Sequence, residues 1–159
     1  MAANSGIIDG GDILVYVNTG TAQSPTWLPA AHCTECSIQN STEVRKRSTK
    51  DTGQFAEKRA GEQTTNISVN ALATYGDFNY FSLRELQLAG TPVMVKYSGR
   101  PAADVTAGKA LVAEQAGDKY EEGLFLITSV ERNDAKDADS TMTAQFENSG
   151  AVEIKTVAV

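Results

Sequence analysis

Two cysteines three residues apart, Cys33 and Cys36, with His32 beside them, come nearest to a motif that does chemistry. Such a C-x-x-C pair serves in zinc knuckles and in thiol redox sites. A structural zinc site needs four ligands, and the chain has no second cysteine pair and no second histidine. Residues three apart on a strand also point to opposite faces of a sheet. We therefore interpret the pair as small packed residues of a strand, and we expect no metal and no cofactor.

Catalytic arrangements of other kinds are also missing from the sequence. A single histidine beside the cysteines gives no Ser-His-Asp or Cys-His set, and there is no G-x-S-x-G turn. Gly10-Gly11 follows no strand and precedes no G-K-[ST], so it is not a phosphate loop. Paired acids such as Glu121-Glu122 are normally solvated. The sequence predicts that the protein is not an enzyme.

Composition places the chain among ordinary globular proteins. Its 159 residues fit a single domain spanning residues 1–159, with 41% hydrophobic and 21% charged residues. The net charge of −6 disfavours ordinary nucleic-acid binding. No apolar run reaches the roughly 20 residues that cross a bilayer, and residues 1–11 do not resemble a signal peptide. We expect synthesis in the cytoplasm and no membrane insertion.

Residues 45–63 form a long excursion that is almost entirely polar, with Phe55 as its only large apolar residue. Long segments of this kind in compact domains are usually functional or disordered. The basic run at its start is short and has no interleaved aromatics, so it does not resemble a nucleic-acid patch. Acids follow in the same excursion, which favours a charged interaction arm. The candidate contact residues are Arg45, Lys46, Arg47, Lys50, Asp51, Phe55, Glu57, Lys58 and Arg59.

Alternation of apolar and polar residues predicts a chain made mostly of strands. Residues 1–11 form an N-terminal arm without regular structure. This order of elements favours a mainly β fold, a β-sandwich or barrel of antiparallel strands flanked by one α-helix, with a long polar loop or hairpin. It argues against a doubly wound fold. The expected strands are 12–17, 33–44, 64–73, 92–98, 123–132 and 141–148, with a last strand or tail at 152–159 and an insertion at 99–118.

One helix is expected from about Phe78 to Ala89, capped by Asp77 or a neighbouring residue and ended by Gly90. Apolar side chains surround nearly its whole circumference. A helix of this kind is normally covered on most sides, and one small domain covers only one face easily. The other face predicts a partner subunit. The candidate contact residues on the helix are Phe78, Phe81 and Leu88.

The order and spacing of these segments resemble the major tail tube proteins of long-tailed phages, in particular the TP901-1-like family, whose relatives occur in gene transfer agents. The similarity begins with Gly-Asp-Ile-Leu-Val-Tyr-Val-Asn at residues 11–18. Its most specific part is the turn Ser-Thr-Lys-Asp-Thr-Gly at residues 48–53, followed by Glu57 and Gly61. The segment 100–120 is longer than the family pattern, and the cysteine pair is not part of it.

The resemblance implies a structural virion protein that assembles in the host cytoplasm. Such subunits form hexameric rings that stack into the tail tube, the conduit for DNA ejection. The excursion 45–63 would reach a neighbouring subunit or ring, and the arm would order on stacking. Its partners would be further copies of itself, the tape measure protein and the tail tip and terminator proteins. DNA would be transient cargo, and the acidic excess would keep it from adhering to the lumen.

Two other functions remain as alternatives. The tube of a contractile tail or of a secretion system shares the fold. A non-catalytic β-sandwich binding module is a different class, and it would present exposed aromatics on a strand face or on loops. The aromatic residues here gather instead around the expected helix, at Tyr75, Phe78, Tyr80 and Phe81.

Overall fold

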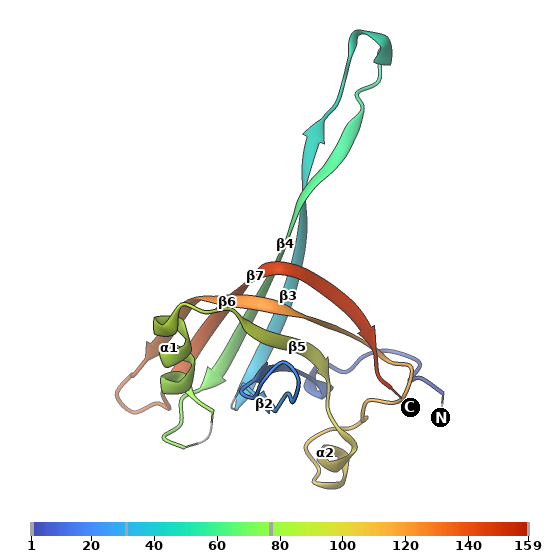
Figure 1. Cartoon of the computed structure of the whole chain (residues 1–159). Helices are drawn as coiled ribbons and strands as arrows, with labels where there is room; N and C mark the ends of the chain where they lie inside the picture. Colours follow the sequence, from blue (N-terminus) through green and yellow to red (C-terminus); the bar gives the residue numbers. More distant parts are fainter. Residues whose placement is uncertain (1, 31, 77, 159) are drawn as a thin grey trace.

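The computed structural model describes residues 2–30, 32–76 and 78–158, and it consists of one antiparallel sheet with little helix (Figure 1). Its strands are β1 Ile13–Asn18, β2 Trp27–Pro29, β3 Cys33–Lys46, β4 Lys58–Leu72, β5 Val93–Gly99, β6 Lys119–Asn133 and β7 Thr141–Thr156. Its helices are α1 Tyr80–Ala89 and the short α2 Ala102–Thr106, and the 3-10 turns are η1 Gly10–Asp12 and η2 Lys50–Thr52.

The seven strands lie in the order β2-β1-β5-β6-β7-β4-β3, and every neighbouring pair is antiparallel. The sheet curls until β3 approaches β1 and β5. There the Cys36 thiol donates to the carbonyl of Ile13 at 3.6 Å, and the Tyr97 hydroxyl donates to the carbonyl of Cys36 at 3.4 Å. No described residues pair β2 with β3, so the curled sheet is not a closed barrel. The expected mainly β, antiparallel fold is confirmed.

The core lies inside this curl, because alternate residues of the central strands face it. On β4 the inward residues are Ile67, Val69 and Ala71, each at most 2% exposed. β7 and β6 supply larger side chains, among them Phe146 and Phe125, which are each 1% exposed. Helix α1 covers one end of the core with the fully buried Leu83. The remaining core residues are Val15, Val17, Ala30, Val93, Val95, Ile127, Met142 and Ala144.

The ends of α1 follow from its capping residues. The Asn79 side chain accepts hydrogen bonds from the backbone N–H groups of Phe81 and Ser82, at 3.0 and 3.4 Å. Gly90 ends the helix with φ of 67°, a left-handed conformation that glycine adopts without strain, as expected. The expected cap Asp77 lies outside the described residues, and the helix begins two residues later than Phe78.

Other boundaries differ from the expectation. The excursion 45–63 is the outer end of a β-hairpin, since β3 extends to Lys46 and β4 starts at Lys58. Of the expected loop or hairpin, the structure has the hairpin, and the polar composition concealed only how far its strands extend, because backbone pairing needs no apolar side chains. The expected segments 141–148 and 152–159 merge into β7, which continues past Gly150, whose φ is 134°. The insertion 99–118 contains α2. Among the described residues, no helix has the length and hydrophobicity to span a membrane.

The N-terminal arm has no regular structure before η1, but hydrogen bonds hold it against the segment that precedes β6. The Asn4 backbone N–H donates to Asp118 at 2.7 Å, and its side chain donates to Asp118 and to the carbonyl of Ala113. Asp12, which is 6% exposed, accepts from the N–H groups of Leu111 and Val112 at 2.7 and 3.1 Å. Two anchors therefore fix the arm at its ends.

Core packing gives a first prediction, for Phe125→Ala. Removing this buried ring leaves a cavity, so we expect the free energy of unfolding to fall by about 3–5 kcal/mol. The matched control is Leu126→Ala on the same strand, whose side chain is 37% exposed and which should cost about 1 kcal/mol or less. Chemical denaturation of both variants measures the difference. Equal losses would contradict the assigned inward face of β6.

The arm gives a second prediction, for Asp118→Ala. Hydrogen bonds from the N–H of Gln115 and then from Asn4 hold the pKa of Asp118 below its ordinary value. A lowered folded-state pKa means that the carboxylate's contribution is complete at neutral pH and is lost as the pH falls through that value. We expect the substitution to speed amide exchange at Asn4 at neutral pH, and acidification of the wild type to lower the protection factor of that amide relative to its intrinsic exchange rate. Asp139→Ala, in the exposed β6–β7 turn, should leave that exchange unchanged.

Candidate functional site

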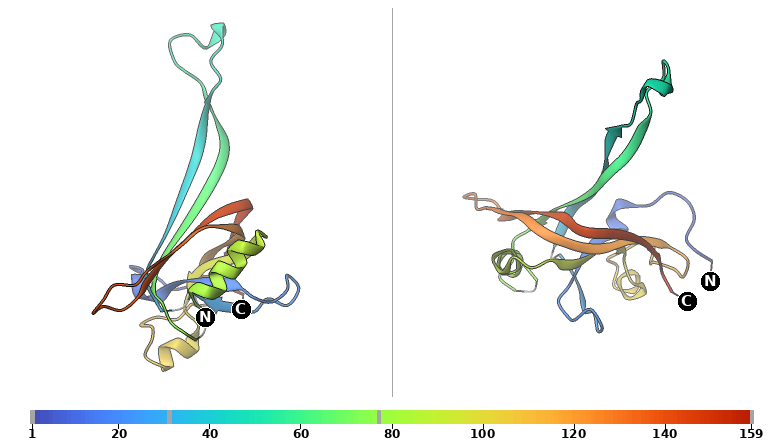
Figure 2. Two further views of the ribbon diagram at one scale, coloured as in Figure 1. Left: turned by 90° about the vertical axis from the view of Figure 1, so that its left-hand side faces the viewer. Right: turned by 45° about the horizontal axis from the view of Figure 1, so that its top comes forward.

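The β3–β4 hairpin projects far beyond the rest of the molecule (Figures 1 and 2). β3 pairs with β4 along its length, from Cys33 opposite Ala71 to Lys46 opposite Lys58, whereas β4 pairs with β7 only over residues 66–72. The outer half of the hairpin therefore has no third strand beside it and buries almost nothing. A two-stranded ribbon of this kind is only marginally stable in water. The outer hairpin therefore gains little stability from packing within the subunit.

Charge makes the outer hairpin less stable still. Arg45 lies directly opposite Arg59, and Lys46 lies directly opposite Lys58. Like charges at opposed positions of a strand pair are destabilising. One compensating ion pair is present, from Arg45 to Glu43 at 3.3 Å, but both side chains are half exposed, so it contributes little. Cations that lie opposite each other in this way favour contact with an acidic surface, which would neutralise them.

The tip of the hairpin is a short ordered loop. The N–H of Arg47 donates to the carbonyl of Glu57 at 2.9 Å, which closes the ribbon. Thr49 caps η2 by accepting from the N–H of Asp51, and Gly53 follows with φ of 67°. Phe55 stands outside this turn and is 85% exposed. The sequence Ser-Thr-Lys-Asp-Thr-Gly at residues 48–53 thus shapes the loop that presents an aromatic side chain and several charges to solvent.

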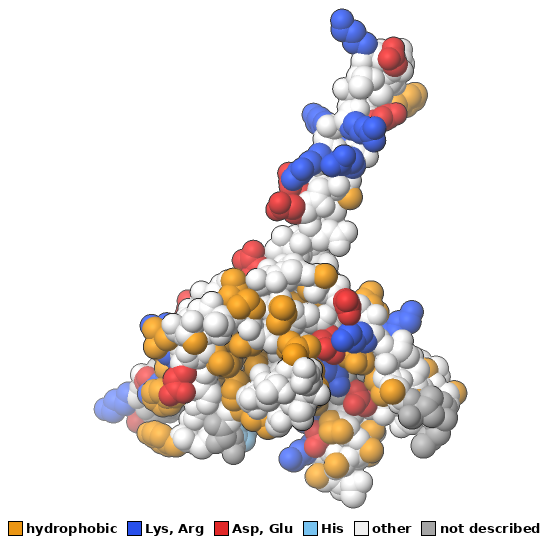
Figure 3. Space-filling model, viewed as in Figure 1, with side chains coloured by type: hydrophobic (Ala, Val, Ile, Leu, Met, Phe, Trp, Pro, Cys, Tyr) orange, Lys and Arg blue, Asp and Glu red, His pale blue; other side chains and the backbone are white. Residues whose placement is uncertain are grey.

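The hairpin and the rest of the chain have opposite charge. Residues 45–59 include six cations and two acids, a net charge of +4. Because the whole chain has a net charge of −6, all other residues together have −10. Lys and Arg side chains gather along the projection in Figure 3, whereas on the larger body below it they are scattered among acidic and apolar patches. Coulomb attraction therefore favours contact between the hairpin of one copy and the body of another.

Helix α1 has an uncovered side, as its composition predicted. Phe81 and Leu88 lie about two helical turns apart on α1, and their side chains are 51% and 69% exposed. Phe78, which precedes the helix, is instead half-buried against the core. Tyr75, in the turn before it, is fully exposed. Exposed apolar side chains that gather on one element are typical of interaction surfaces.

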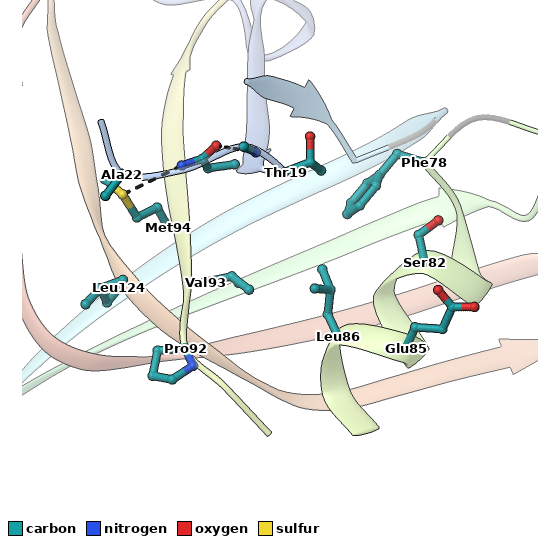
Figure 4. A pocket seen from close by; sticks show the side chains of 12 residues that line it. Thr19, Ala22, Phe78, Ser82, Glu85, Leu86, Pro92, Val93, Met94 and Leu124 are labelled. Carbon is teal, nitrogen blue, oxygen red and sulfur yellow. Dashed lines mark hydrogen bonds between the residues drawn. The ribbon is translucent and has the colours of Figure 1, made fainter. Parts of the chain in front are cut away.

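An open groove of about 670 Å³ runs beside α1 (Figure 4). One wall consists of Phe78, Ser82, Glu85 and Leu86, and the β1–β2 loop supplies polar backbone at the other. Its floor is apolar and comes from β5 and β6. The residues of the floor are Pro92, Val93, Met94 and Leu124. The groove contains no pair of groups suited to acid–base or nucleophilic chemistry, and its character is that of a contact surface.

A third feature escaped the sequence analysis: the sheet face away from the core has no cation over the central, paired segments of β3, β4, β7 and β6. Residues 33–44, 60–72, 124–131 and 141–149 contain no Lys or Arg. The strand register aligns the outward side chains in rows across β3, β4, β7 and β6. These rows are Glu35-Asn70-Thr143-Glu131, Ser37-Ser68-Gln145-Ser129 and Gln39-Asn66-Glu147-Leu126. Solvent faces of sheets normally mix both signs of charge. We call these rows the cation-free face.

A family model described as phage tail tube protein matches residues 7–154. The chain belongs to this family. The match extends from the arm to the end of β7, and it confirms the tail tube family that the resemblance indicated. The narrower TP901-1-like subfamily stays a prediction. No protein with a curated description matches this tail tube protein in sequence.

Solved structures with the same fold include other tube proteins. The chain is similar to a protein of the tail of an empty gene transfer agent particle, with C6 symmetry, at a TM-score of 0.70 and 16% identity, over 94% of this chain and 99% of that chain. A protein of the SPP1 tail tube is similar at a TM-score of 0.69 and 12% identity, over 96% and 81%. The tube-terminating cap of the anti-feeding prophage is similar at 0.64 and 13%, over 99% and 96%. At these low sequence identities, the similarity shows a shared fold.

The predicted contact residues of this tail tube protein fall into two separate groups. The nine residues predicted in the excursion all lie in the outer hairpin. Phe81 and Leu88 lie on the open side of α1, whereas Phe78 faces the groove and the core. The structure does not bring α1 to the hairpin. Their roles in assembly stay predictions.

The cysteine pair requires a correction. Cys33 and Cys36 were expected on opposite faces, but both pack against the core. The reason is a β-bulge between Cys33 and Glu35, which inserts one residue and returns the second thiol to the same side. A hydrogen bond with Cys36 raises the pKa of Cys33, and the same bond lowers the pKa of Cys36 to about 6. In the described part of the chain, no three His, Cys, Asp or Glu residues are grouped to hold a metal.

The opposed cations give a third prediction, for Lys58→Glu. This change places an acid opposite Lys46, so we expect the isolated subunit to gain about 0.2–1 kcal/mol in local hairpin stability. Slower amide exchange across residues 43–47 would show it. Lys50→Glu, in the tip loop without a strand partner, is the matched control. A hairpin that exchanges faster in Lys58→Glu would contradict the repulsion.

Proposed function

We propose that this protein polymerises as stacked hexameric rings and so forms the tail tube of a phage-like particle, the conduit for DNA ejection into the host. The observation that supports this most is the cationic hairpin, with a charge of +4, projecting from a body of −10. A projection attracted to the body of the next copy can repeat without limit. The C6 symmetry of the similar gene transfer agent tail supports rings of six.

In this role the protein is structural and has no catalytic site. The hairpin residues Arg45 to Arg59 contact an adjacent subunit or the next ring. Further partners are the tape measure protein and the proteins that close the two tube ends. The subunit is synthesised in the host cytoplasm and resides in the virion. Tubes of contractile systems share the fold, so the proposal concerns the tube and not the kind of tail.

The experiment compares assembly of the wild type with the triple variant Lys46→Ser, Lys50→Ser and Lys58→Ser. Electron microscopy and sedimentation follow purified protein across a range of concentrations and salt. We expect hollow tubes of constant diameter from the wild type, weakened by salt because exposed charges are screened. The variant should give separate rings or monomers, since the attraction between hairpin and body is reduced.

The control is Lys109→Ser with Lys136→Ser, which removes cations from two exposed loops of the body. This variant should form tubes as the wild type does. Wild-type protein that forms no ring or tube even on a purified tail tip complex would contradict the proposal. Normal tubes from the triple variant would contradict the role of the hairpin.

The cation-free face is the surface that we propose lines the channel. DNA adheres to proteins chiefly through Lys and Arg, which displace condensed counterions from the phosphates. A wall of hydroxyl and amide side chains with Glu35, Glu131 and Glu147 offers DNA no such contact. DNA can then slide through without being held.

A fourth prediction tests the lining, with the double variant Ser68→Lys and Gln145→Lys. Added cations in the channel should retain DNA, so we expect short duplexes to sediment with the variant tubes at low salt and to be released at high salt. Wild-type tubes should leave the duplex in the supernatant. Ala103→Lys with Thr106→Lys, on exposed α2, adds equal charge elsewhere. Duplex retained equally by this control would place the cation-free face outside the channel.

A further inference from the structure

Exposed apolar side chains gather at two places that the hairpin contact does not use. The first, which we call the α1 surface, is the open groove together with Tyr75, Phe81 and Leu88. The second, which we call the arm surface, consists of Ile7, Ile8, Leu111 and Val112, which are 101%, 75%, 75% and 49% exposed. An ordinary monomer exposes apolar side chains singly, whereas several are exposed together at each of these two places.

Hydrogen bonds hold the arm surface in place against the body. Asn4 and Asp12, on either side of the two isoleucines, are each hydrogen-bonded to the segment that contains Leu111 and Val112. Asp12 accepts from the backbone N–H groups of those two residues, which leaves their apolar side chains turned to solvent. Ile7 and Ile8 thus lie on a segment that is tied on both sides to the segment of Leu111 and Val112, and all four apolar side chains are exposed.

The two surfaces lie at opposite ends of β6. The arm surface adjoins the start of that strand through Asp118. The α1 surface adjoins its other end, where Gln87 donates to the carbonyl of Thr128 and Arg132 lies over the ring of Phe81. Along β6, Thr128 and Arg132, which α1 contacts, lie roughly 30–45 Å from Asp118, which the arm contacts. Figures 1 and 2 show α1 and the chain ends on opposite sides of the body. A single copy cannot join them.

We propose that the α1 surface of one copy receives the arm surface of a second copy, head to tail. The proposal rests on ring formation, and it names the two surfaces that close the ring. A ring of more than two copies needs an interface between two different patches, because a patch that pairs with itself stops at a dimer. The groove beside α1 has an apolar floor that its own subunit leaves open, and the arm surface has four exposed apolar side chains that can cover such a floor.

Two variants test the interface. Variant one, Phe81→Asp with Leu88→Asp, damages only the α1 surface. Variant two, Ile8→Asp with Leu111→Asp, damages only the arm surface. We expect each alone to raise the concentration needed for ring formation by roughly tenfold or more. Mixed together they should form a one-to-one dimer that does not grow, because each retains the surface that the other lost.

Analytical ultracentrifugation distinguishes the outcomes, and far-ultraviolet circular dichroism verifies that each variant is folded. The control is the double variant Lys119→Asp with Lys136→Asp, which adds acidic side chains near both ends of β6 but outside the two surfaces. This control should assemble normally. Variants that assemble like the wild type, a single variant that dimerises with itself, or a mixture that stays monomeric would each overturn the head-to-tail contact. Wild-type protein that forms no ring or tube even on a purified tail tip complex would overturn the proposed function as well, whereas failure of the variants alone overturns only the head-to-tail contact.

Discussion

Pairing between β4 and β7 is the interaction on which the rest of the structure depends. Over residues 66–72, β4 joins the hairpin to the body, and β4 is the only strand with which β3 pairs among the described residues. The same seven residues place Ile67, Val69 and Ala71 in the core and Asn66, Ser68 and Asn70 on the outer face. Residues 66–72 therefore set the direction of the hairpin, the side chains that β4 places in the core, and those that it contributes to the cation-free face.

How far the sequence predicts this fold depends on whether side chains or only backbone make the contacts. The alternation at residues 64–73 and 141–148 identified the strands that bury apolar side chains, and Gly90 identified the end of α1. The outer hairpin buries nothing, so its strands left no apolar pattern to detect. The bulge after Cys33 could not be predicted either, since one inserted residue changes the face of every later side chain without changing composition.

The candidate surfaces show the same division. Charge density identified the hairpin residues, and the all-round apolar composition of α1 identified Phe81 and Leu88, because both signals are properties of contiguous sequence. The cation-free face and the arm surface combine segments that are far apart along the chain. Only the register of the strands and the hydrogen bonds of Asn4 and Asp12 bring those segments together. A single sequence contains no local trace of such long-range neighbours.

The hairpin leaves the body on one side only, and this asymmetry gives any assembly a direction. A stack held by hairpin-to-body contacts has free basic projections at one end and an uncovered acidic surface at the other. Two stacks meeting projection to projection, or acid to acid, repel one another, so end-to-end fusion in the wrong sense is disfavoured. The two extremities are chemically unlike, and a single capping protein cannot fit both. Length control and initiation then belong to different termini of the same filament.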